Sequence, residues 1–545
     1  MIANILIPAV ATLIASVALY ALKILHRNWT SPLKFIDGPP CANPLMGHFT
    51  LIFDVPDTTV KWRAEYGTTF MAKSLFYENE LYTTDITALS HILSHGSLYT
   101  KPYALLFNLQ EVMGDGILSV DRDPHRRQRK ILSPAFGPQQ LRAMNEVFVE
   151  KGNMLRDMLA KDVDAAGGTV TTNMSDWFRQ VTLDIIGEAG FGYQFKSLET
   201  HGKKEAELST VFARMFQNPN LNFYRAFQAA QADIPILRAL PLPGWTVTRY
   251  ARKKLRAIGT ELLNKSKTEA ASLGSKNLTS GRDLLSLLVK ANMSSEAPQS
   301  QRMSDDEVIA QIPTFFLAGH ETSSLALAWA THALSSDQSV QDKLRQELLS
   351  VPTETPTMDE LNALPFLENV LRETMRLHSP LVSTERMAER DDVLPLSKPY
   401  VDRQGISHES LPIRKGQLFH IPVLEVNNSK ELWGEDALEF RPERWDNVPE
   451  AVKAIPGVWA HQMTFLAGKH SCMGFQFTIV EQKAILFALL RRFVFLPASE
   501  EVKPTVSGFF QRPISFVRGG SDKAGLVSAG GLRVIVKAYK GEAPA

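Results

Sequence analysis

The sequence predicts a mainly α-helical protein with a small β region. Apolar residues recur at helical spacing in most segments of the 545-residue chain, whereas strand-like runs are few and short. The composition, 44% hydrophobic and 21% charged, is typical of a chain that buries a large core. No internal repeat and no shift in composition marks a second domain, so we expect one globular domain over residues 45–545.

An uncharged apolar stretch, residues 2–22, opens the chain. A helix of this length spans roughly 30 Å of hydrocarbon, and Lys23, His26 and Arg27 follow it, which by the positive-inside rule places the remaining chain in the cytosol. A cleaved secretory signal is the alternative. The stretch is longer than the usual signal core, has no basic segment before it and has no small-residue cleavage site after it. We therefore expect residues 1–25 to be a single-pass membrane anchor.

Residues 26–44 form the predicted connector between this anchor and the globular domain. The segment contains Pro32, Pro39, Pro40 and Pro44 together with Gly38. Proline lacks a backbone N–H and restricts φ, so a proline-rich segment is stiff and extended rather than helical.

Helical periodicity and short β-rich runs divide the globular domain. Helices are predicted at 60–66, 85–94, 139–159, 176–187, 204–216, 246–271, 283–290, 305–335, 339–350, 358–377 and 475–493. Strands are predicted at 69–74, 80–84, 417–423 and 532–538.

Charge, cysteine content and missing motifs exclude several classes of protein. With 59 Lys and Arg against 58 Asp and Glu, the net charge of +1 gives no reason to expect nucleic-acid binding. The two cysteines, Cys41 and Cys472, cannot form a disulfide framework and are typical of a reducing compartment. The sequence lacks a dinucleotide-binding G-x-G-x-x-G, a phosphate-binding P-loop and a G-x-S-x-G nucleophile elbow. A redox role would therefore take its electrons from another protein.

One of the cysteines lies in a short loop before a long apolar helix. Residues 465–474 read FLAGKHSCMG, and a thiolate that binds a metal must be held at a fixed angle by such a shielded loop. Gly468 and Gly474 allow the backbone to turn, the N-terminal amides of the next helix lie near Cys472, and Phe465 can pack against a flat macrocycle. Without further context, a lone cysteine before a helix is more often a buried structural residue.

The loop resembles the haem-binding signature of the cytochrome P450 family, F-x-x-G-x-R-x-C-x-G, with His470 in the place of the usual Arg. The resemblance implies that Cys472 is the axial thiolate ligand of haem b iron. It also implies that Phe465, His470 and Gly474 contact the haem.

Two further motifs occur in the order that this family has them. Glu373 and Arg376 form an E-x-x-R pair on one helix face, and FRPERW supplies Arg444 before the cysteine loop. As isolated patterns they are most often exposed ion pairs of small effect. The resemblance implies that the three side chains support the chain segment behind the haem loop.

The predicted helix 305–335 contains Ala318, Gly319, Glu321 and Thr322, which resemble the family's [AG]-G-x-[DE]-T-[TS] segment. Ala318 and Thr322 share a helix face, and Gly319 removes a side chain beside them, so a small ligand could lie in a groove there. A seam of small residues for helix packing is the alternative. The resemblance implies that Thr322 and Glu321 activate oxygen and deliver protons, with Ala318 and Gly319 beside the haem. Pro313 is expected to kink this helix.

The haem carboxylates have their own predicted partners. In DRDPHRRQRKILSPAF, His125 and Arg129 take the places of the family's W-x-x-x-R pair, and Arg386 matches a third partner. The basic side chains around them suit the docking of an acidic electron-transfer protein. These side chains are Arg126, Arg127, Lys130 and Lys469.

Together the resemblances cover residues 35–540 and imply a microsomal, fungal-like cytochrome P450 monooxygenase of the endoplasmic reticulum, with its catalytic domain in the cytosol. Its electrons would come from NADPH through NADPH–cytochrome P450 reductase, with cytochrome b5 as a second donor. The expected substrate is a bulky lipophilic molecule of secondary metabolism, a sterol or terpenoid. Apolar residues predicted to line its pocket by family position are Phe107 and Ile117 in the loop before the His125 helix, Phe212, Phe216, Phe315, Phe316, Val382, Phe509 and Phe510.

Three other functions stay open at this point. A fatty acid or an aromatic xenobiotic is the nearest alternative substrate. A second class is an isomerase with the same fold that needs no reductase, although Thr322 with its acidic neighbour favours a monooxygenase. A third is a haem-binding sensor without turnover.

Overall fold

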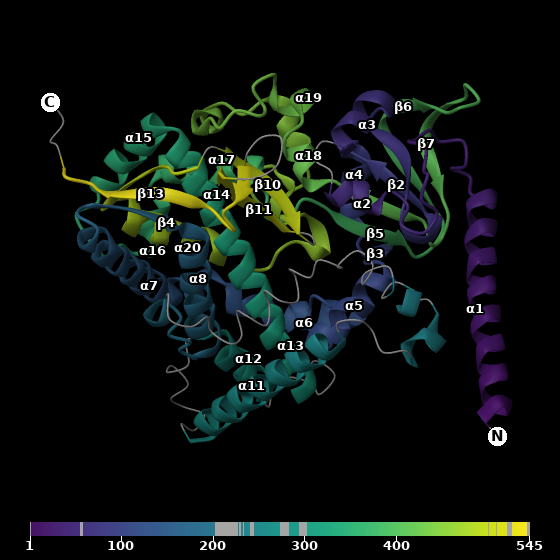
Figure 1. Ribbon diagram of the computed structural model, residues 1–545, viewed down its shortest axis with the longest axis horizontal. Coiled ribbons are helices and arrows are strands. Elements are labelled where there is room, and N and C mark those ends of the chain that lie inside the picture. Colours follow the sequence, from purple (N-terminus) through teal and green to yellow (C-terminus); the bar gives the residue numbers. More distant parts are fainter. Residues whose placement is uncertain are drawn as a thin grey trace.

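The computed structural model describes residues 2–54, 58–201, 227, 230–232, 234–239, 245–272, 283–293, 302–499, 501–507, 510–519 and 526–541. The predicted helix 204–216 lies outside these residues. Within them, most of the helices gather on one side and a mixed β-rich part lies on the other, next to the N-terminal helix (Figure 1).

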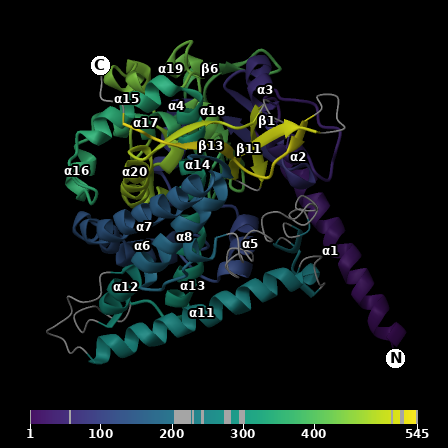
Figure 2. The same ribbon diagram turned by 60° about the vertical axis from the view of Figure 1, so that its left-hand side comes forward.

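The N-terminal helix α1 (Ile2–Thr30) extends away from the body (Figure 2). It continues five residues beyond the predicted anchor boundary, and the helix-free segment begins at Ser31. Its C-terminal end contacts the body, where Arg27 pairs with Glu78 at 2.8 Å and the Asn28 side chain donates to the Tyr77 carbonyl at 2.8 Å. Within the described chain, residues 10–30 are the one helical stretch long and apolar enough to cross a membrane.

The β-rich part is built on a five-stranded sheet with the order β1-β2-β8-β5-β3. Its strands are β1 (Thr69–Lys73), β2 (Asn79–Thr83), β3 (Tyr99–Thr100), β5 (Thr384–Ala388) and β8 (Leu418–Ile421). The nearby helices are α2 (Phe49–Asp54), α3 (Thr58–Tyr66) and α4 (Ile86–Ser94). Asp85 caps α4 by accepting a hydrogen bond from the Ala88 backbone, which explains why this helix begins where the sequence predicts.

Three smaller sheets complete the β structure. In the first, β6 (Asp392–Val401) pairs with β7 (Ser407–Ile413). In the second, the central strand β13 (Arg533–Ala538) pairs with β4 (Thr169–Asn173) and β9 (Phe493–Pro497), and in the third, the central strand β11 (Phe510–Arg518) pairs with β10 (Glu501–Ser507) and β12 (Leu526–Ser528). Apart from β13, these strands are not predicted from the sequence. Strand β6 contains Pro395 and Pro399, which argue against a strand, yet an exposed two-stranded hairpin tolerates them.

The remaining helices form the helical part, with α11 along its lower edge in Figure 2, except that α18 and α19 pack with the five-stranded sheet. They are α5 (Tyr103–Met113), α6 (Arg122–Leu132), α7 (Pro138–Ala165), α8 (Met174–Phe191), α11 (Trp245–Ser272), α12 (Leu284–Met293), α13 (Asp305–Phe316), α14 (Thr322–Ser336), α15 (Gln338–Leu349), α16 (Met358–Asn362), α17 (Pro365–Leu377), α18 (Val423–Asn427), α19 (Lys430–Trp433) and α20 (Phe475–Leu490). Short 3-10 segments are η1 (Leu75–Tyr77), η2 (Ser133–Phe136), η3 (Leu198–Thr200), η4 (Pro235–Ala239), η7 (Pro442–Asp446), η8 (Glu450–Ala454), η9 (Met463–Phe465) and η10 (Gly468–His470).

Two predicted long helices are interrupted. The predicted helix 305–335 consists of α13, a π-helical turn η6 (Leu317–Glu321) and α14, so it changes its hydrogen-bond pattern at η6 and continues through Pro313. The predicted helix 358–377 is wrong as a single element, because Pro365 begins a separate helix α17. Single π-helical turns inside α-helices occur frequently at functional sites.

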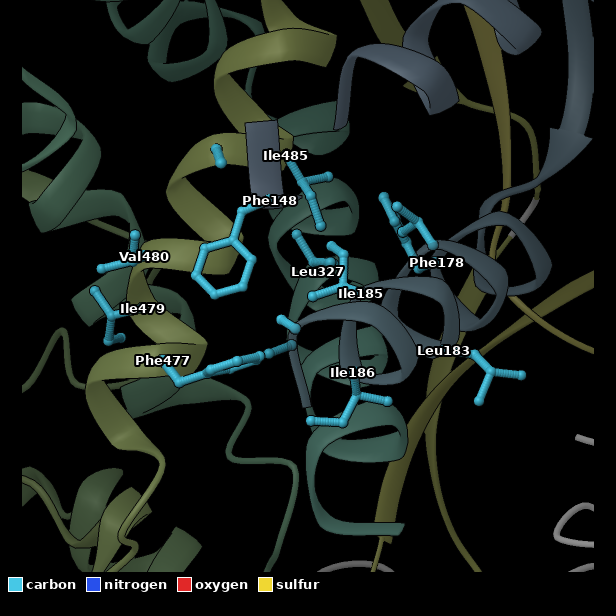
Figure 3. Close-up of a cluster of buried hydrophobic side chains, with 14 of the residues drawn as sticks. Phe148, Phe178, Leu183, Ile185, Ile186, Leu327, Phe477, Ile479, Val480 and Ile485 are labelled. Atoms are coloured by element: carbon cyan, nitrogen blue, oxygen red, sulfur yellow. The ribbon is translucent and has the colours of Figure 1, made fainter. Parts of the chain in front are cut away.

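The core lies where α7, α8, α14 and α20 meet (Figure 3). Phe148 of α7 and Phe477 of α20 pack edge to face with ring centroids 4.7 Å apart, and Ile185 and Leu327 are fully buried nearby. Burial of each such side chain contributes about 1.5–3 kcal/mol. This packing fixes α20 in place and therefore also fixes the Cys472 loop that leads into it.

Candidate active site at the Cys472 loop

The Cys472 loop is held by the backbone on both sides of the thiol. The Cys472 N–H donates to the Phe465 carbonyl at 2.8 Å, and the Gly474 N–H, at the start of α20, donates to the sulfur. Burial raises the pKa of the Cys472 thiol to about 11, although the side chain keeps accessible surface. A side chain that is both surrounded by protein and accessible lines an internal space and not the outer surface.

The backbone requires glycine at one of the two glycine positions of this loop but not at the other. Gly468 has a φ of +68°, and a Cβ there would lie 2.0 Å from the Leu93 carbonyl oxygen, so only glycine fits. Gly474 has a φ of −90°, and a Cβ there would make an ordinary contact with Phe136 at 3.7 Å. The expectation that Gly474 is needed for a backbone turn is therefore wrong. Its contact with the haem stays a prediction.

Arg129 of α6 donates hydrogen bonds to the Cys472 loop. Its guanidinium donates to the Ser471 carbonyl at 2.7 Å and to the Ser471 hydroxyl at 3.0 Å. Ser471 precedes the cysteine, so this predicted carboxylate partner also fixes the backbone beside the thiol. Phe465 is buried and packs against Trp459 and Phe475.

His470 is tied to Asp121, a residue that the sequence analysis did not select. The His470 Nε2 lies 2.9 Å from the Asp121 carboxylate, and its ring packs on His125 with centroids 4.6 Å apart. Burial opposes the ionisation of Asp121, but hydrogen bonds from His470 and from the Lys101 and Arg122 amides outweigh burial and keep its pKa below the usual range. Burial and the neighbouring His470 lower the pKa of His125 to about 3, so that ring is neutral at pH 7.

Two buried cations lie close to this cluster. Lys101, which the sequence analysis also missed, donates from Nζ to the Leu118 and Val120 carbonyls, and burial lowers its pKa to about 8. Arg386 donates to the Thr384 hydroxyl and the Glu385 carbonyl, and burial lowers its pKa to about 10. Buried cations whose hydrogen bonds go to neutral oxygen atoms are stabilised by an anion beside them. These residues and the Cys472 thiol fit a haem with its two carboxylates.

Ala318 and Thr322 form an accessible window in the α13–α14 helix, most of whose other residues are buried. The Thr322 hydroxyl donates to the Ala318 carbonyl at 2.6 Å; Ala318 lies within the π-helical turn η6, and Thr322 directly follows it. Gly319 does not open space on this face: a Cβ there would lie 2.9 Å from Ile186 of α8, so the glycine permits close helix packing. The groove interpretation of Gly319 is therefore wrong, and the packing alternative explains it.

Glu321, the predicted proton carrier, is buried and paired with Arg512 of β11 at 2.5 Å. Arg512 lies 191 residues further along the chain, and no local pattern in the sequence marks it.

Glu373, Arg376 and Arg444 come together in the interior. The Glu373 and Arg376 side chains are fully buried and form a bidentate pair at 2.8 and 2.9 Å, and Arg444 Nε lies 3.3 Å from the same carboxylate. Trp445 Nε1 also donates to Glu373 at 3.1 Å, and Arg376 donates to the Asn427 and Ala437 carbonyls. The pair is not the exposed ion pair that an isolated E-x-x-R would suggest.

The predicted pocket residues separate into several groups. Phe107 lies in helix α5 and not in a loop, with its ring 4.9 Å from the Arg238 guanidinium. Ile117 is buried beside α13, where its N–H donates to Gln311, and Val382 is half-buried. Phe315 and Phe510 are also buried. Phe212, Phe216 and Phe509 lie outside the described residues.

Phe316 is not a pocket residue. Its side chain is fully buried and packs against Phe191 and Phe195, with ring centroids 4.6 and 5.2 Å away. Adjacent residues of a helix point about 100° apart, and although Phe315 also contacts Phe191, at 6.4 Å, its second ring contact is Phe136 at 5.7 Å. The pocket prediction for Phe316 is therefore wrong.

A surface groove of about 1050 Å³ lies elsewhere, between α7 and residues 355–359. Its lining contains none of the predicted site residues, and its Arg142 and Asp359 are paired with each other. The groove is thus unrelated to the chemistry at Cys472.

A mainly helical fold, a cysteine loop at the start of a core helix and buried cations beside the loop together define a haem-thiolate protein. The cytochrome P450 family model matches residues 37–517, and the chain belongs to this family. It is accordingly an oxidoreductase whose family implies haem iron with a thiolate ligand, a lipophilic substrate and a redox partner.

Fungal proteins are similar to the chain over almost its full length. Cytochrome P450 monooxygenase 205 of Postia placenta is 44% identical, with 95% of this chain and 96% of the relative covered. Cytochrome P450 monooxygenase 128 of the same fungus is 43% identical, with 94% and 95% covered. The ganoderic acid synthetase CYP5150L8 of Ganoderma lucidum is 32% identical, with 87% and 90% covered.

Proposed function

We propose that this protein is a membrane-anchored monooxygenase that hydroxylates or epoxidises a bulky lipophilic substrate, a sterol or a terpenoid. One atom of dioxygen enters the substrate, and the other leaves as water. The observation that carries the proposal is the accessible pair Ala318 and Thr322 at a π-helical turn, in a protein that also presents the Cys472 thiol to an internal space.

Each residue of the candidate site has its own proposed role. Haem b, bound through the Cys472 sulfur, supplies the activation of dioxygen. Lys101, Arg129 and Arg386 would hold its carboxylates by charge, while the Arg129–Ser471 and Asp121–His470 contacts join α6 to the Cys472 loop. Thr322 places a hydroxyl on the accessible face, where it can hold water, and Glu321 supplies the proton that must reach oxygen.

Apolar side chains near the window support a lipophilic substrate. Phe315 lies three residues before Ala318 and so shares its helix face, while Ile117 packs beside α13. One relative is named a ganoderic acid synthetase. The test is a spectral binding screen of sterols, terpenoids and fatty acids with the haem-loaded protein, followed by analysis of the products.

NADPH–cytochrome P450 reductase is the proposed electron donor, with cytochrome b5 as a second one. The absence of a dinucleotide-binding motif in the sequence supports a separate donor. On the predicted docking face Arg126 is exposed and forms a surface pair with Asp123, whereas Arg127 is paired with Glu307 of α13. Consumption of NADPH that requires both the purified reductase and this protein would support the proposal.

The proposed location is the endoplasmic reticulum membrane, with residues 1–25 as the anchor, 26–44 as the connector and 45–545 as the catalytic domain in the cytosol. The basic residues after the apolar stretch support this orientation. The end of α1 contacts the body at Tyr77, and exposed apolar side chains among residues 45–77 offer a second membrane contact. They are Leu45, Leu51, Val60 and Tyr77.

Deletion of residues 2–22 should release the protein from membranes only in part, because this second apolar surface remains. Haem content should equal that of the full chain, since the deletion keeps the Arg27 and Asn28 contacts with the body. Flotation with microsomes and haem per polypeptide are the measurements. A deletion variant that binds no haem, when the full chain does, would contradict a separate anchor.

Thr322→Ala should leave haem content and substrate affinity close to wild type, because it removes a hydroxyl and little volume. Coupling should fall: NADPH and oxygen are still consumed, but more electrons end in hydrogen peroxide and fewer in product. Added peroxide should restore part of the product, since peroxide already carries its protons. Product and peroxide per NADPH are measured with the compound that the binding screen selects. An unchanged ratio would make Thr322 a packing residue and favour the reductase-independent isomerase.

A further inference from the structure

The carboxylate of Glu321 has a partner from a distant strand. Arg512 of β11 approaches it at 2.5 Å, and the two side chains are only 16% and 11% exposed. An ion pair that is largely removed from water holds its geometry more firmly than a surface pair, because solvent does not screen it. The contact therefore restricts where the Glu321 carboxylate can lie.

The backbone that carries Arg512 is fixed from two sides. The Gln511 N–H donates to the Pro380 carbonyl at 2.9 Å, and Trp329 of α14 donates to the Gln511 carbonyl at 3.2 Å. Phe510 forms a β-bridge with Leu381. Arg512 thus projects from a strand that is hydrogen-bonded to the same helix that begins at Thr322.

The other groups around Glu321 do not replace this cation. His320 is buried, its Nε2 has no hydrogen-bond partner within the described residues, and burial lowers its pKa to about 4, so it is neutral at pH 7. Arg179 of α8 is paired with Asp176. The Thr182 hydroxyl holds the backbone of the π-helical turn by donating to the His320 carbonyl at 3.1 Å.

We propose that Arg512 is the positioning residue for proton delivery: by pairing with Glu321 it fixes that carboxylate at the end of the π-helical turn, one residue before Thr322 in the chain. This inference rests on the proposed monooxygenase function and deepens it. A free glutamate side chain samples several rotamers, whereas the fixed guanidinium selects one of them. Because Phe510 lies on the same strand, the position of the proton carrier is also linked to a wall of the predicted pocket.

The test needs no knowledge of the substrate. Without substrate, reductase-driven turnover ends in either of two balanced reactions. NADPH, a proton and oxygen give NADP⁺ and hydrogen peroxide, whereas two NADPH, two protons and oxygen give two NADP⁺ and two waters. Both reactions consume protons, but water forms only if protons are delivered so that the O–O bond breaks before peroxide is released, so the peroxide formed per NADPH reports on delivery.

Five full-length proteins with reductase and NADPH are compared with wild type: Glu321→Gln, Arg512→Gln, the double variant, Arg512→Lys and the control Lys503→Gln. Lys503 lies in the same hairpin and pairs with Glu501, so its substitution also removes one positive charge. We expect Glu321→Gln and Arg512→Gln each to raise peroxide per NADPH by at least about twofold, and the double variant to equal the larger single effect. Arg512→Lys should recover part of the loss, and Lys503→Gln should match wild type.

The thermal midpoints of the same haem-loaded proteins provide a readout without turnover. Paired residues should give a double-variant shift smaller than the sum of the two single shifts. Additive midpoint shifts, or an Arg512→Gln protein with wild-type peroxide per NADPH, would overturn the inference while leaving the proposed function intact. If NADPH consumption by the reductase does not rise when the wild-type protein is added, the proposed function fails and the inference fails with it.

Discussion

Cys472→Ser should yield a folded protein without the carbon monoxide difference spectrum of a haem-thiolate protein. Serine has nearly the same size, and the backbone bond from residue 472 to the Phe465 carbonyl does not involve the side chain. A hydroxyl oxygen, however, is a far poorer iron ligand than a thiolate, which a coordinating metal deprotonates outright. We expect the loss of the thiolate-type band to be complete. The spectrum of the reduced protein under carbon monoxide is the measurement.

Cys41→Ser is the matched control. Cys41 lies in the proline-rich connector, with its Sγ 3.4 Å from the Asn43 carbonyl, far along the chain from the haem loop. This variant should keep the full spectrum. Retention of the thiolate-type band by Cys472→Ser, or its loss from Cys41→Ser, would contradict the assignment of Cys472 as the ligand.

Glu373→Ala should give little folded haem protein. The substitution leaves Arg376 and Arg444 buried without the carboxylate that both contact, and stranding a buried charge costs about 3–5 kcal/mol. This is a large part of the 5–15 kcal/mol by which a typical domain is stable. Soluble yield, haem per polypeptide and the midpoint of denaturant unfolding are the measurements.

Arg372→Ala is the control on the same helix. Arg372 also pairs with a glutamate, Glu368 at 3.0 Å, but its side chain is 33% exposed. Water screens this pair, so we expect a loss below about 1 kcal/mol and a normal haem content. A normally folded, haem-loaded Glu373→Ala protein would show that the buried network is dispensable.

The Glu373 network supports the Cys472 loop because its hydrogen bonds join the chain segments that lead into that loop. Arg376 donates to the Asn427 carbonyl, and the Asn427 side chain accepts from the Met463 N–H at 2.8 Å. The Thr464 hydroxyl donates to the Met375 carbonyl on the same helix as Glu373. Loss of this support should therefore reduce haem binding even in molecules that remain compact.

The residues that sequence analysis could find are those whose role depends on local spacing. The Cys472 loop is read from ten consecutive residues, and Glu373 and Arg376 share a face because a helix repeats every 3.6 residues. The mainly helical fold and the cytochrome P450 family are confirmed. Local caps and prolines also set the ends of several helices, as Asp85 does for α4.

The sequence alone therefore determined the family and the order of most of the long helices, and it identified the Cys472 thiol as the proposed iron ligand. Only the tertiary structure decided how η6 interrupts the α13–α14 helix, that Gly319 faces Ile186 and that Phe316 belongs to the core. It alone joined Asp121 to His470 and Arg512 to Glu321. The partners in these pairs are separated by 349 and 191 residues. Which charged side chains meet depends on how the helices and strands pack, a property that no local pattern in the chain encodes.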